Sequence, residues 1–257
     1  MQRSKYCRIA PLGLCLMVLR TARAKLMQKL LGTITAVSTH TPVVALTFDD
    51  GPHPLFTPRL LDILKKHNAY ATFFMIGAAA ARSPDIVRRV AKAGHTIGNH
   101  SWDHQSFPLL TGRKRRAQLR ACQQVIAPYG KRLFRPPYGH QNTVSRLDAF
   151  LLGFQVVTWN IVAYDWLAHD AAWMVERGGK QIRPGSIILF HDRLHDYLDP
   201  RYDSRDAMLE AVDMLLSEFG KQFRFITIPA LLQSGSLQKT TWLMKPDLDF
   251  LQKLHCA

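Results

Sequence analysis

Three patterns that identify whole classes of protein are missing from this chain. The four cysteines show no close pairing and no Cys-x-x-Cys, so neither a disulfide framework nor a thiolate zinc site is indicated. No Gly-x-Gly-x-x-Gly follows the first predicted strand, which argues against dinucleotide binding. The apolar run from Ile9 to Leu19 is shorter than the ~20 residues that a membrane-spanning helix needs, so no transmembrane helix is expected.

Acidic residues are also scarce in two stretches of this basic chain. The formal net charge is +15, and residues 1–31 contain seven Lys/Arg and no acid. A second acid-free stretch, from Gln105 to Arg146, includes the basic run 113–116. Such patches suit anionic polymers, membrane surfaces or nucleic acid, although a solvated helix face has the same composition. No aromatic interleaving or nucleic-acid motif accompanies them, so we expect no nucleic acid partner and leave peripheral association with anionic surfaces open.

Residues 1–41 form a basic N-terminal extension with three interpretations. Basic residues before the apolar run and Ala22-Arg23-Ala24 after it resemble a signal peptide with a small-residue cleavage site. Arg20 and Arg23 argue against export, because that part of a signal is normally uncharged. A peripheral helix and a start codon upstream of a shorter natural protein are the alternatives. A cytoplasmic or membrane-peripheral location is slightly favoured over secretion.

From Pro42 to Leu232, predicted strands and helices alternate about seven times with short connections. The predicted strands are 42–46, 71–77, 96–98, 133–134, 155–162, 186–190 and 224–228. The predicted helices are 57–67, 83–94, 113–126, 143–152, 171–181 and 206–219. This alternation implies parallel strands with right-handed crossovers, hence an α/β fold that is either a barrel or an open doubly wound sheet.

One domain over residues 42–232 is sufficient, because no internal linker interrupts the alternation. Residues 233–257 have the composition of a C-terminal tail, with a predicted helix around Leu248–Leu254.

The first chemical motif is Thr-Phe-Asp-Asp-Gly-Pro at residues 47–52, directly after a predicted buried strand. Gly51-Pro52 turns the chain where the strand ends. Since side chains alternate along a strand, Asp49 and Asp50 cannot both be ordinary exposed residues on one face. Either the pair is a solvated turn, or both carboxylates reach into a cleft.

Two histidines follow the third predicted strand at a spacing of four residues, in the segment His100-Ser101-Trp102-Asp103-His104. On a helical turn this spacing places both imidazoles on one face, where they can hold one metal ion. Most histidine pairs at this spacing are surface residues, but this pair lies at a strand end, as the two aspartates do. Two histidines and one carboxylate leave positions open on a zinc-type ion, as a hydrolytic metal needs.

Three more polar clusters lie at predicted strand ends. Arg135 precedes Pro-Pro-Tyr-Gly and can hold a carboxylate with two hydrogen bonds. Asp165-Trp166 follows one strand, and His191-Asp192 ends the most apolar one. Taken singly, Arg135 could belong to a surface ion pair, Asp165 could cap a helix, and His191 could be a core histidine. Polar clusters at five successive strand ends instead predict an active site, since barrel active sites are built at the carboxyl ends of strands.

In this order, the clusters resemble the five motifs of the polysaccharide deacetylase family, the NodB-homology domain of carbohydrate esterase family 4. The resemblance covers residues 42–232 and includes Ala71-Thr72-Phe73-Phe74 and the segment 94–99. It implies a distorted barrel of β/α units, here with about seven units. It also implies hydrolysis of an acetyl group on a carbohydrate, with the help of one divalent metal that is usually zinc.

The resemblance implies metal ligands and a base. Asp50, His100 and His104 would hold the metal, and Asp49 would be the general base that activates water. The residues alone do not decide which of the two aspartates is the base and which the ligand.

The resemblance also implies roles for the other motif residues. His191 would be the general acid, Arg135 would orient the base, and Asp165 would tune the charged network around both. The backbone N–H of Tyr138 would stabilise the oxyanion. The acetyl-methyl pocket would be lined by Trp166 and Leu189.

The fourth motif departs from the family pattern, which often reads Trp-x-x-Asp-x-x-Asp-Trp. Val162 replaces the first aspartate, whereas Asp165 keeps the second. We therefore expect an active enzyme with an altered substrate cleft. The loop from Arg193 to Arg205, with Tyr197 and Tyr202, is either another place of substrate recognition or a surface excursion.

The leading hypothesis is a metal-dependent hydrolase that removes N-acetyl groups from an amino-sugar polymer, oligomer or glycoconjugate, so the expected partner is an acetylated carbohydrate. An O-acetyl esterase acting on xylan-type polysaccharide is the alternative within the same chemistry. From other classes, the chain could be a non-catalytic carbohydrate-binding relative or a basic adaptor for anionic polymers. The residues expected to bind metal or act in catalysis argue against a loss of turnover, because all seven are present: Asp49, Asp50, His100, His104, Arg135, Asp165 and His191.

Overall fold

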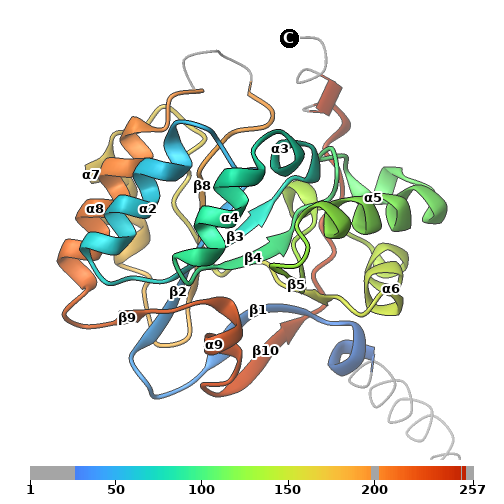
Figure 1. The fold of residues 1–257 in the computed structure, drawn as a ribbon. Coiled ribbons are helices and arrows are strands. Elements are labelled where there is room, and N and C mark those ends of the chain that lie inside the picture. Colours follow the sequence, from blue (N-terminus) through green and yellow to red (C-terminus); the bar gives the residue numbers. More distant parts are fainter. Residues whose placement is uncertain (1–26, 198–202, 250, 253–257) are drawn as a thin grey trace, which may run out of the picture.

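The computed structural model describes residues 27–197, 203–249 and 251–252, and its centre is a parallel β-sheet (Figure 1). The strands lie in the order β6-β5-β4-β3-β2-β8-β7, and β9 pairs with β2 outside this order. Their bounds are β2 Val43–Asp49, β3 Ala71–Met75, β4 Thr96–Asn99, β5 Gly130–Phe134, β6 Gln155–Val156, β7 Ile161–Val162, β8 Ile187–His191 and β9 Arg224–Phe225. All these pairings are parallel, as the alternating sequence pattern predicts.

Helices cover the outer face of this curled sheet and connect its strands. They are α2 Phe56–Lys66, α3 Gly77–Arg82, α4 Pro84–Lys92, α5 Gly112–Val125, α6 Thr143–Leu151, α7 Ala171–Gly179, α8 Asp206–Phe219 and α9 Ile228–Leu232. In Figure 1, α2, α7 and α8 pack together at the left of the molecule, and α5 packs against α6 at the right. The arrangement confirms the predicted α/β fold with a distorted β/α barrel.

The barrel is closed by a segment that the sequence predicts as one strand. Residues 155–162 form two short strands, β6 and β7, with a bend between them. The Val157 N–H donates to the Phe134 carbonyl beside β5 at 2.9 Å, whereas the Asn160 N–H donates to the Ile187 carbonyl beside β8 at 3.1 Å. The chain therefore crosses from one edge of the sheet to the other, and the prediction of one continuous strand is wrong.

Two other strands are shorter than predicted because helices begin early. The strand predicted over residues 224–228 ends at Phe225, and Pro229 lies in the first turn of α9, where its fixed φ favours a helix. The strand predicted to reach Gly77 ends at Met75, and α3 begins at Gly77.

An antiparallel ribbon that the sequence analysis did not predict lies beside the barrel. It joins β1 (Thr33–Ser38) to β10 (Ser236–Thr240). A bridge between Ile34 and Val157 attaches this ribbon to the closing segment of the barrel. The domain boundaries at residues 41 and 232 stay a prediction.

The ends of the chain are described only in part. The predicted tail helix is present at residues 248–249 and 251–252, and its remaining residues lie outside the described ranges. The apolar run from Ile9 to Leu19 also lies outside them. Within the described ranges, no helix is long and apolar enough to cross a bilayer.

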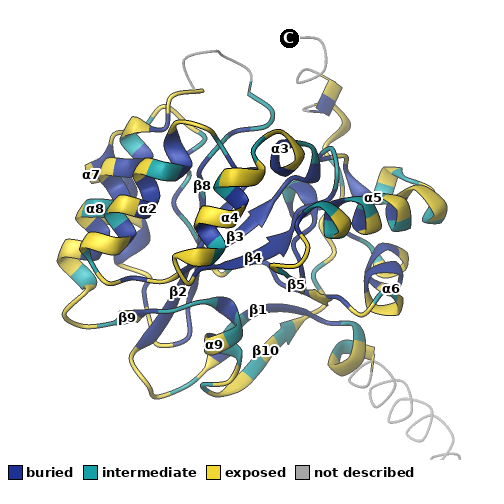
Figure 2. Cartoon of the chain, in the orientation of Figure 1, coloured by how far each residue is buried: buried dark blue, intermediate teal, exposed yellow. Residues whose placement is uncertain are grey.

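The hydrophobic core is centred on β2, where all seven residues are buried. The Phe48 ring stacks on Phe73 with 5.2 Å between ring centroids, and Phe190 lies 6.1 Å from Phe48. Figure 2 shows the central strands buried beneath helices whose outer faces are exposed. The polar residues at the end of β2 are therefore supported by a packed interior.

Replacing Leu46 by Ala tests this account of the core. Leu46 is 0% exposed in the middle of β2, so Leu46→Ala should lower the free energy of unfolding by about 2–5 kcal/mol. Leu55→Ala is the matched control, because Leu55 is 56% exposed and its loss should change stability by less than about 0.5 kcal/mol. Urea denaturation measures both, and equal effects would contradict the central place of β2.

Candidate active site

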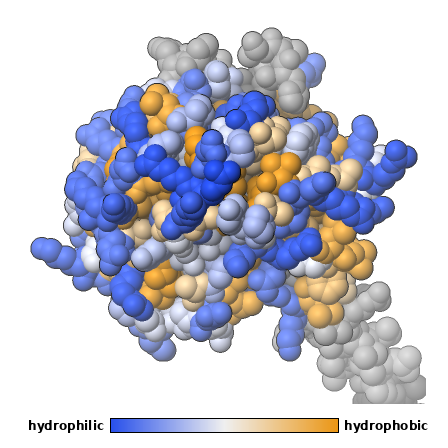
Figure 3. Space-filling model, in the orientation of Figure 1, coloured by the Kyte–Doolittle hydropathy of each residue, from blue (hydrophilic) through white to orange (hydrophobic). Residues whose placement is uncertain are grey.

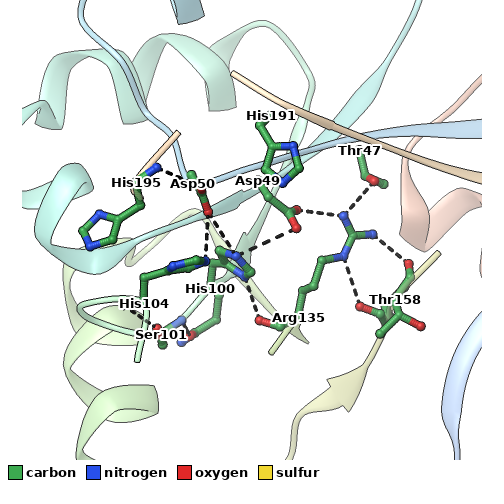
Figure 4. A network of polar contacts seen from close by, with 12 residues as sticks. Thr47, Asp49, Asp50, His100, Ser101, His104, Arg135, Thr158, His191 and His195 are labelled. Carbon is green, nitrogen blue, oxygen red and sulfur yellow. Dashed lines mark hydrogen bonds and ion pairs between the residues drawn. The ribbon is translucent and has the colours of Figure 1, made fainter. Parts of the chain in front are cut away.

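Strand register brings two of the predicted site residues side by side. β2 ends at Asp49 and β8 ends at His191, and these residues are direct partners in the parallel pairing. β4 ends one residue before His100, and β5 ends one residue before Arg135. Because the carboxyl ends of parallel strands share one edge of the sheet, the polar clusters meet there (Figure 4).

Asp50, His100 and His104 form a buried group that could hold a metal ion. One ligand atom from each residue lies within 4.8 Å of the others. The Nε2 atoms of both histidines lie 3.2 Å from Asp50 Oδ1, which is buried and has no hydrogen-bond partner among the described residues. A cation between the three atoms would satisfy that oxygen, and two nitrogens with one oxygen are ligands that suit zinc. The residues therefore fit the metal that the resemblance implies.

The second ring nitrogen of each histidine is already engaged. His100 Nδ1 lies 2.7 Å from the Arg135 carbonyl oxygen, and His104 Nδ1 lies 2.9 Å from Asp196 Oδ2. These contacts orient both Nε2 atoms toward Asp50. Burial alone would raise the pKa of Asp50, but His104 and His100 hold it well below its ordinary value. Asp50 is therefore ionised, as a carboxylate ligand must be.

Asp49 is held by a fully buried guanidinium. Arg135 Nη1 donates to Asp49 Oδ1 at 2.7 Å and to Thr47 Oγ1 at 2.8 Å, and its other nitrogens donate to the carbonyls of residues 157–158. The second oxygen, Asp49 Oδ2, lies 3.8 Å from His100 Nε2. One oxygen of Asp49 is thus fixed, and the other faces the candidate metal ligands.

His191 forms a hydrogen-bonded pair with Asp165. His191 Nδ1 lies 3.0 Å from Asp165 Oδ1, and the His191 backbone N–H donates to Asp165 Oδ2 at 2.8 Å. Burial alone would lower the pKa of His191, but the Asp165 carboxylate raises it to about 9. Arg205 also contacts Asp165, with Nη1 3.5 Å from Oδ2 and donating to the Asp165 carbonyl oxygen at 2.8 Å.

The other predicted site residues lie near these groups. The Tyr138 ring packs against His104 with 4.4 Å between centroids, and the Trp166 ring meets His191 edge-on at 5.3 Å. Leu189 is buried in β8 and pairs with Val162 of β7.

Backbone strain is concentrated in the same place. Six described non-glycine residues have φ in the left-handed region, and four of them lie at the site, namely Asp50 (70°), Ser101 (69°), His104 (62°) and Tyr138 (56°). Each such conformation costs on the order of 1–3 kcal/mol and persists only where its surroundings enforce it. Their concentration around one group of ligands supports a functional site.

The loop after β8 contributes two residues that the sequence analysis did not single out. Asp196 Oδ2 accepts a hydrogen bond from the Tyr138 hydroxyl as well as contacting His104. The His195 backbone N–H donates to Asp50 Oδ2 at 3.0 Å. The loop from Arg193 thus reaches the candidate metal ligands, while Tyr202 lies outside the described ranges.

Comparison with known proteins identifies the family. The polysaccharide deacetylase family model matches residues 36–157. The chain is 34% identical over 199 residues to the peptidoglycan-N-acetylglucosamine deacetylase of Bacillus cereus. The match covers 76% of this chain and 70% of that protein. The chain is also 36% identical over 166 residues to the chitooligosaccharide deacetylase of Azorhizobium caulinodans. This match covers 63% of the chain and 79% of that protein.

A solved crystal structure shows the same fold. It is a peptidoglycan N-acetylglucosamine deacetylase that matches with a TM-score of 0.74 and 30% identity, over 84% of this chain and 99% of that one. The chain belongs to the polysaccharide deacetylase family, carbohydrate esterase family 4.

Asp196→Asn tests the part that the loop has in metal binding. The substitution removes the negative charge beside His104 Nδ1, so it should weaken zinc binding about 10–100-fold. Asp85→Asn is the control, because the Asp85 side chain is 86% exposed on α4. Competition titration against a zinc chelator measures both affinities. Unchanged affinity in Asp196→Asn would show that the contact does not support the ligand.

Proposed function

We propose that this protein removes N-acetyl groups from an amino-sugar polymer or oligomer by metal-dependent hydrolysis. The observation that carries the proposal is the meeting of three groups at one edge of the sheet: the Asp50-His100-His104 ligands, Asp49 with Arg135, and His191 with Asp165. The named activities of its relatives on peptidoglycan N-acetylglucosamine and chitooligosaccharide support an N-acetylated amino sugar as substrate.

Asp50, His100 and His104 would hold one divalent metal, which we take to be zinc. When bound, the metal polarises the acetyl carbonyl and makes water a stronger nucleophile. The ligand atoms support this choice, since two imidazole nitrogens and one carboxylate oxygen leave positions open for substrate and water.

Asp49 would act as the general base. Arg135 neutralises one carboxylate oxygen and fixes the side chain, while Asp49 Oδ2 faces the metal ligands. Asp49 Oδ2 takes a proton from the attacking water while the water oxygen forms a bond to the acetyl carbon.

His191 would act as the general acid. As the C–N bond breaks, its electron pair stays on nitrogen, which needs a proton to leave as a neutral amine. Asp165 holds His191 Nδ1 and stabilises the protonated ring, so Nε2 supplies that proton. The products are acetate and the free amino sugar.

Tyr138, Trp166 and Leu189 would complete the site. The Tyr138 backbone N–H would stabilise the negative oxygen that forms on the acetyl carbon. Trp166, packed against His191, and Leu189 would contact the acetyl methyl group.

Acetate release from N-acetylglucosamine oligomers by zinc-loaded protein tests the function. Chelation should abolish release, and zinc should restore it. Asp49→Asn should lower kcat about 10²–10⁴-fold while zinc remains bound, because the base is lost and the ligands are not. Release from acetylated xylan in place of these oligomers would favour the O-acetyl esterase, and stoichiometric zinc with no release from either would favour a non-catalytic relative.

The pH dependence of kcat tests the role of His191. The acid must be protonated, and the pKa of His191 is raised to about 9, so kcat should fall as the pH rises through that value. Asp165→Asn removes the charge that raises this pKa and should move the fall to lower pH by about one unit or more. A fall at the same pH in both proteins would exclude His191 as the titrating acid.

A further inference from the structure

One arginine outside the active site is buried without an anionic partner. Arg146 on α6 is 6% exposed, and its Nε is buried with no hydrogen-bond partner. Within the described ranges, no carboxylate forms an ion pair with it. The two other buried arginines of this region differ, since Arg115 pairs with Asp148 at 2.6 Å and Arg135 with Asp49 at 2.7 Å. A buried N–H without an acceptor costs free energy that a bound anion would recover.

Arg146 lines a pocket of about 210 Å³ between α6 and the β1–β10 ribbon. Lys239 of β10 lines the same pocket, and none of the described residues that line it is acidic. The remaining lining is mostly apolar and includes Leu30, Phe150 and Phe154. The pocket therefore suits an anionic group that is joined to an apolar one.

Helix α6 exposes apolar side chains beside this pocket. Val144, Leu147, Phe150 and Leu151 are 41–67% exposed, and their spacing places them on one side of the helix. Figure 3 shows hydrophobic residues gathered over α6, next to hydrophilic residues over α5. A contiguous exposed apolar patch of this kind marks an interaction surface.

Exposed basic side chains lie on the elements next to α6. Helix α5 packs against α6, and the exposed cations of α5 and the start of β5 are Arg113, Lys114, Arg120, Lys131 and Arg132. Asp148 is the single acid between Gln105 and Tyr164. It is buried, and its carboxylate forms ion pairs with Arg115 and Arg116. This distribution of charge favours an anionic partner.

We propose that the face formed by α6, its pocket and the cations of α5 docks on an anionic phospholipid surface. The apolar side chains of α6 enter the boundary between headgroups and acyl chains. Arg146 and Lys239 donate hydrogen bonds to the phosphate of a lipid. The α5 cations contact neighbouring headgroups. A lipid layer supplies negative charge and apolar depth together, whereas a soluble anion would leave the α6 side chains in water.

The pocket and the candidate metal site share no residue. The pocket is lined by both residues of β6, Gln155 and Val156, and by residues of α6, whereas the candidate metal ligands are Asp50, His100 and His104. Docking through the pocket therefore does not use the metal ligands.

Vesicle co-sedimentation of the full chain tests the proposal. The protein should bind vesicles of equimolar phosphatidylglycerol and phosphatidylcholine, bind pure phosphatidylcholine at least tenfold more weakly, and lose affinity as salt rises. The double variant Leu147→Ser/Leu151→Ser should bind anionic vesicles about tenfold more weakly, because less apolar surface enters the lipid. Arg146→Gln and Lys239→Gln should each weaken binding about fivefold.

Matched controls lie on other faces. Lys92→Gln removes an exposed cation of α4, and Met214→Ser removes an exposed apolar side chain of α8. Both should bind vesicles as the natural protein does. All variants should keep the circular dichroism spectrum and the activity on soluble oligosaccharide.

Three results would overturn the proposal. They are equal binding to both vesicle types, unchanged binding by the α6 double variant and both pocket variants, or an equal loss in the controls. Soluble polyphosphate that binds as tightly as vesicles, with no effect of Leu147→Ser/Leu151→Ser, would also overturn it, since such a polymer has no apolar layer. Vesicle binding needs no turnover, so its failure would leave the proposed deacetylase function standing.

Discussion

The buried ion pair between Arg135 and Asp49 is the interaction on which the barrel and its site both depend. A guanidinium that is 0% exposed must have its charge and its N–H groups satisfied, or it would cost several kcal/mol. Arg135 follows β5, its carboxylate partner ends β2, and its other donors reach the bend at residues 157–158. One side chain therefore joins three segments of the barrel, so the orientation of Asp49 depends on the closure of the sheet.

Local sequence pattern was sufficient for most elements, because their amphipathic or apolar periodicity reflects the surface they bury. Helix α8 lies at 206–219, as its periodicity predicts. The bend between β6 and β7 could not be found in this way, since apolar pairs, Val156-Val157 and Ile161-Val162, stand on both sides of it and no Gly or Pro marks it. Only its hydrogen bonds to Phe134 and Ile187 divide it. The β1–β10 ribbon could not be predicted from local pattern either, because its two strands are about 200 residues apart in the sequence.

Most of the candidate site could be predicted because each cluster lies in a short motif at a strand end, and parallel register then brings the motifs together. Asp196 and Arg205 escaped this reasoning. Asp196 contacts His104, 92 residues away, and Arg205 contacts Asp165, 40 residues away. Neither belongs to a motif or a periodic segment, so only the folded chain shows that the loop after β8 contacts His104 and Asp165.

The direct pairing of Asp49 with His191 has a consequence for how such an enzyme can change. The separation between the backbones of the proposed base, Asp49, and the proposed acid, His191, follows from the spacing of adjacent strands, ~4.8 Å, and not from any loop. Loops such as the one after β8 can therefore lengthen, shorten or change composition in evolution without altering this distance. New carbohydrate substrates can be acquired at the rim while the proton-transfer geometry is inherited intact.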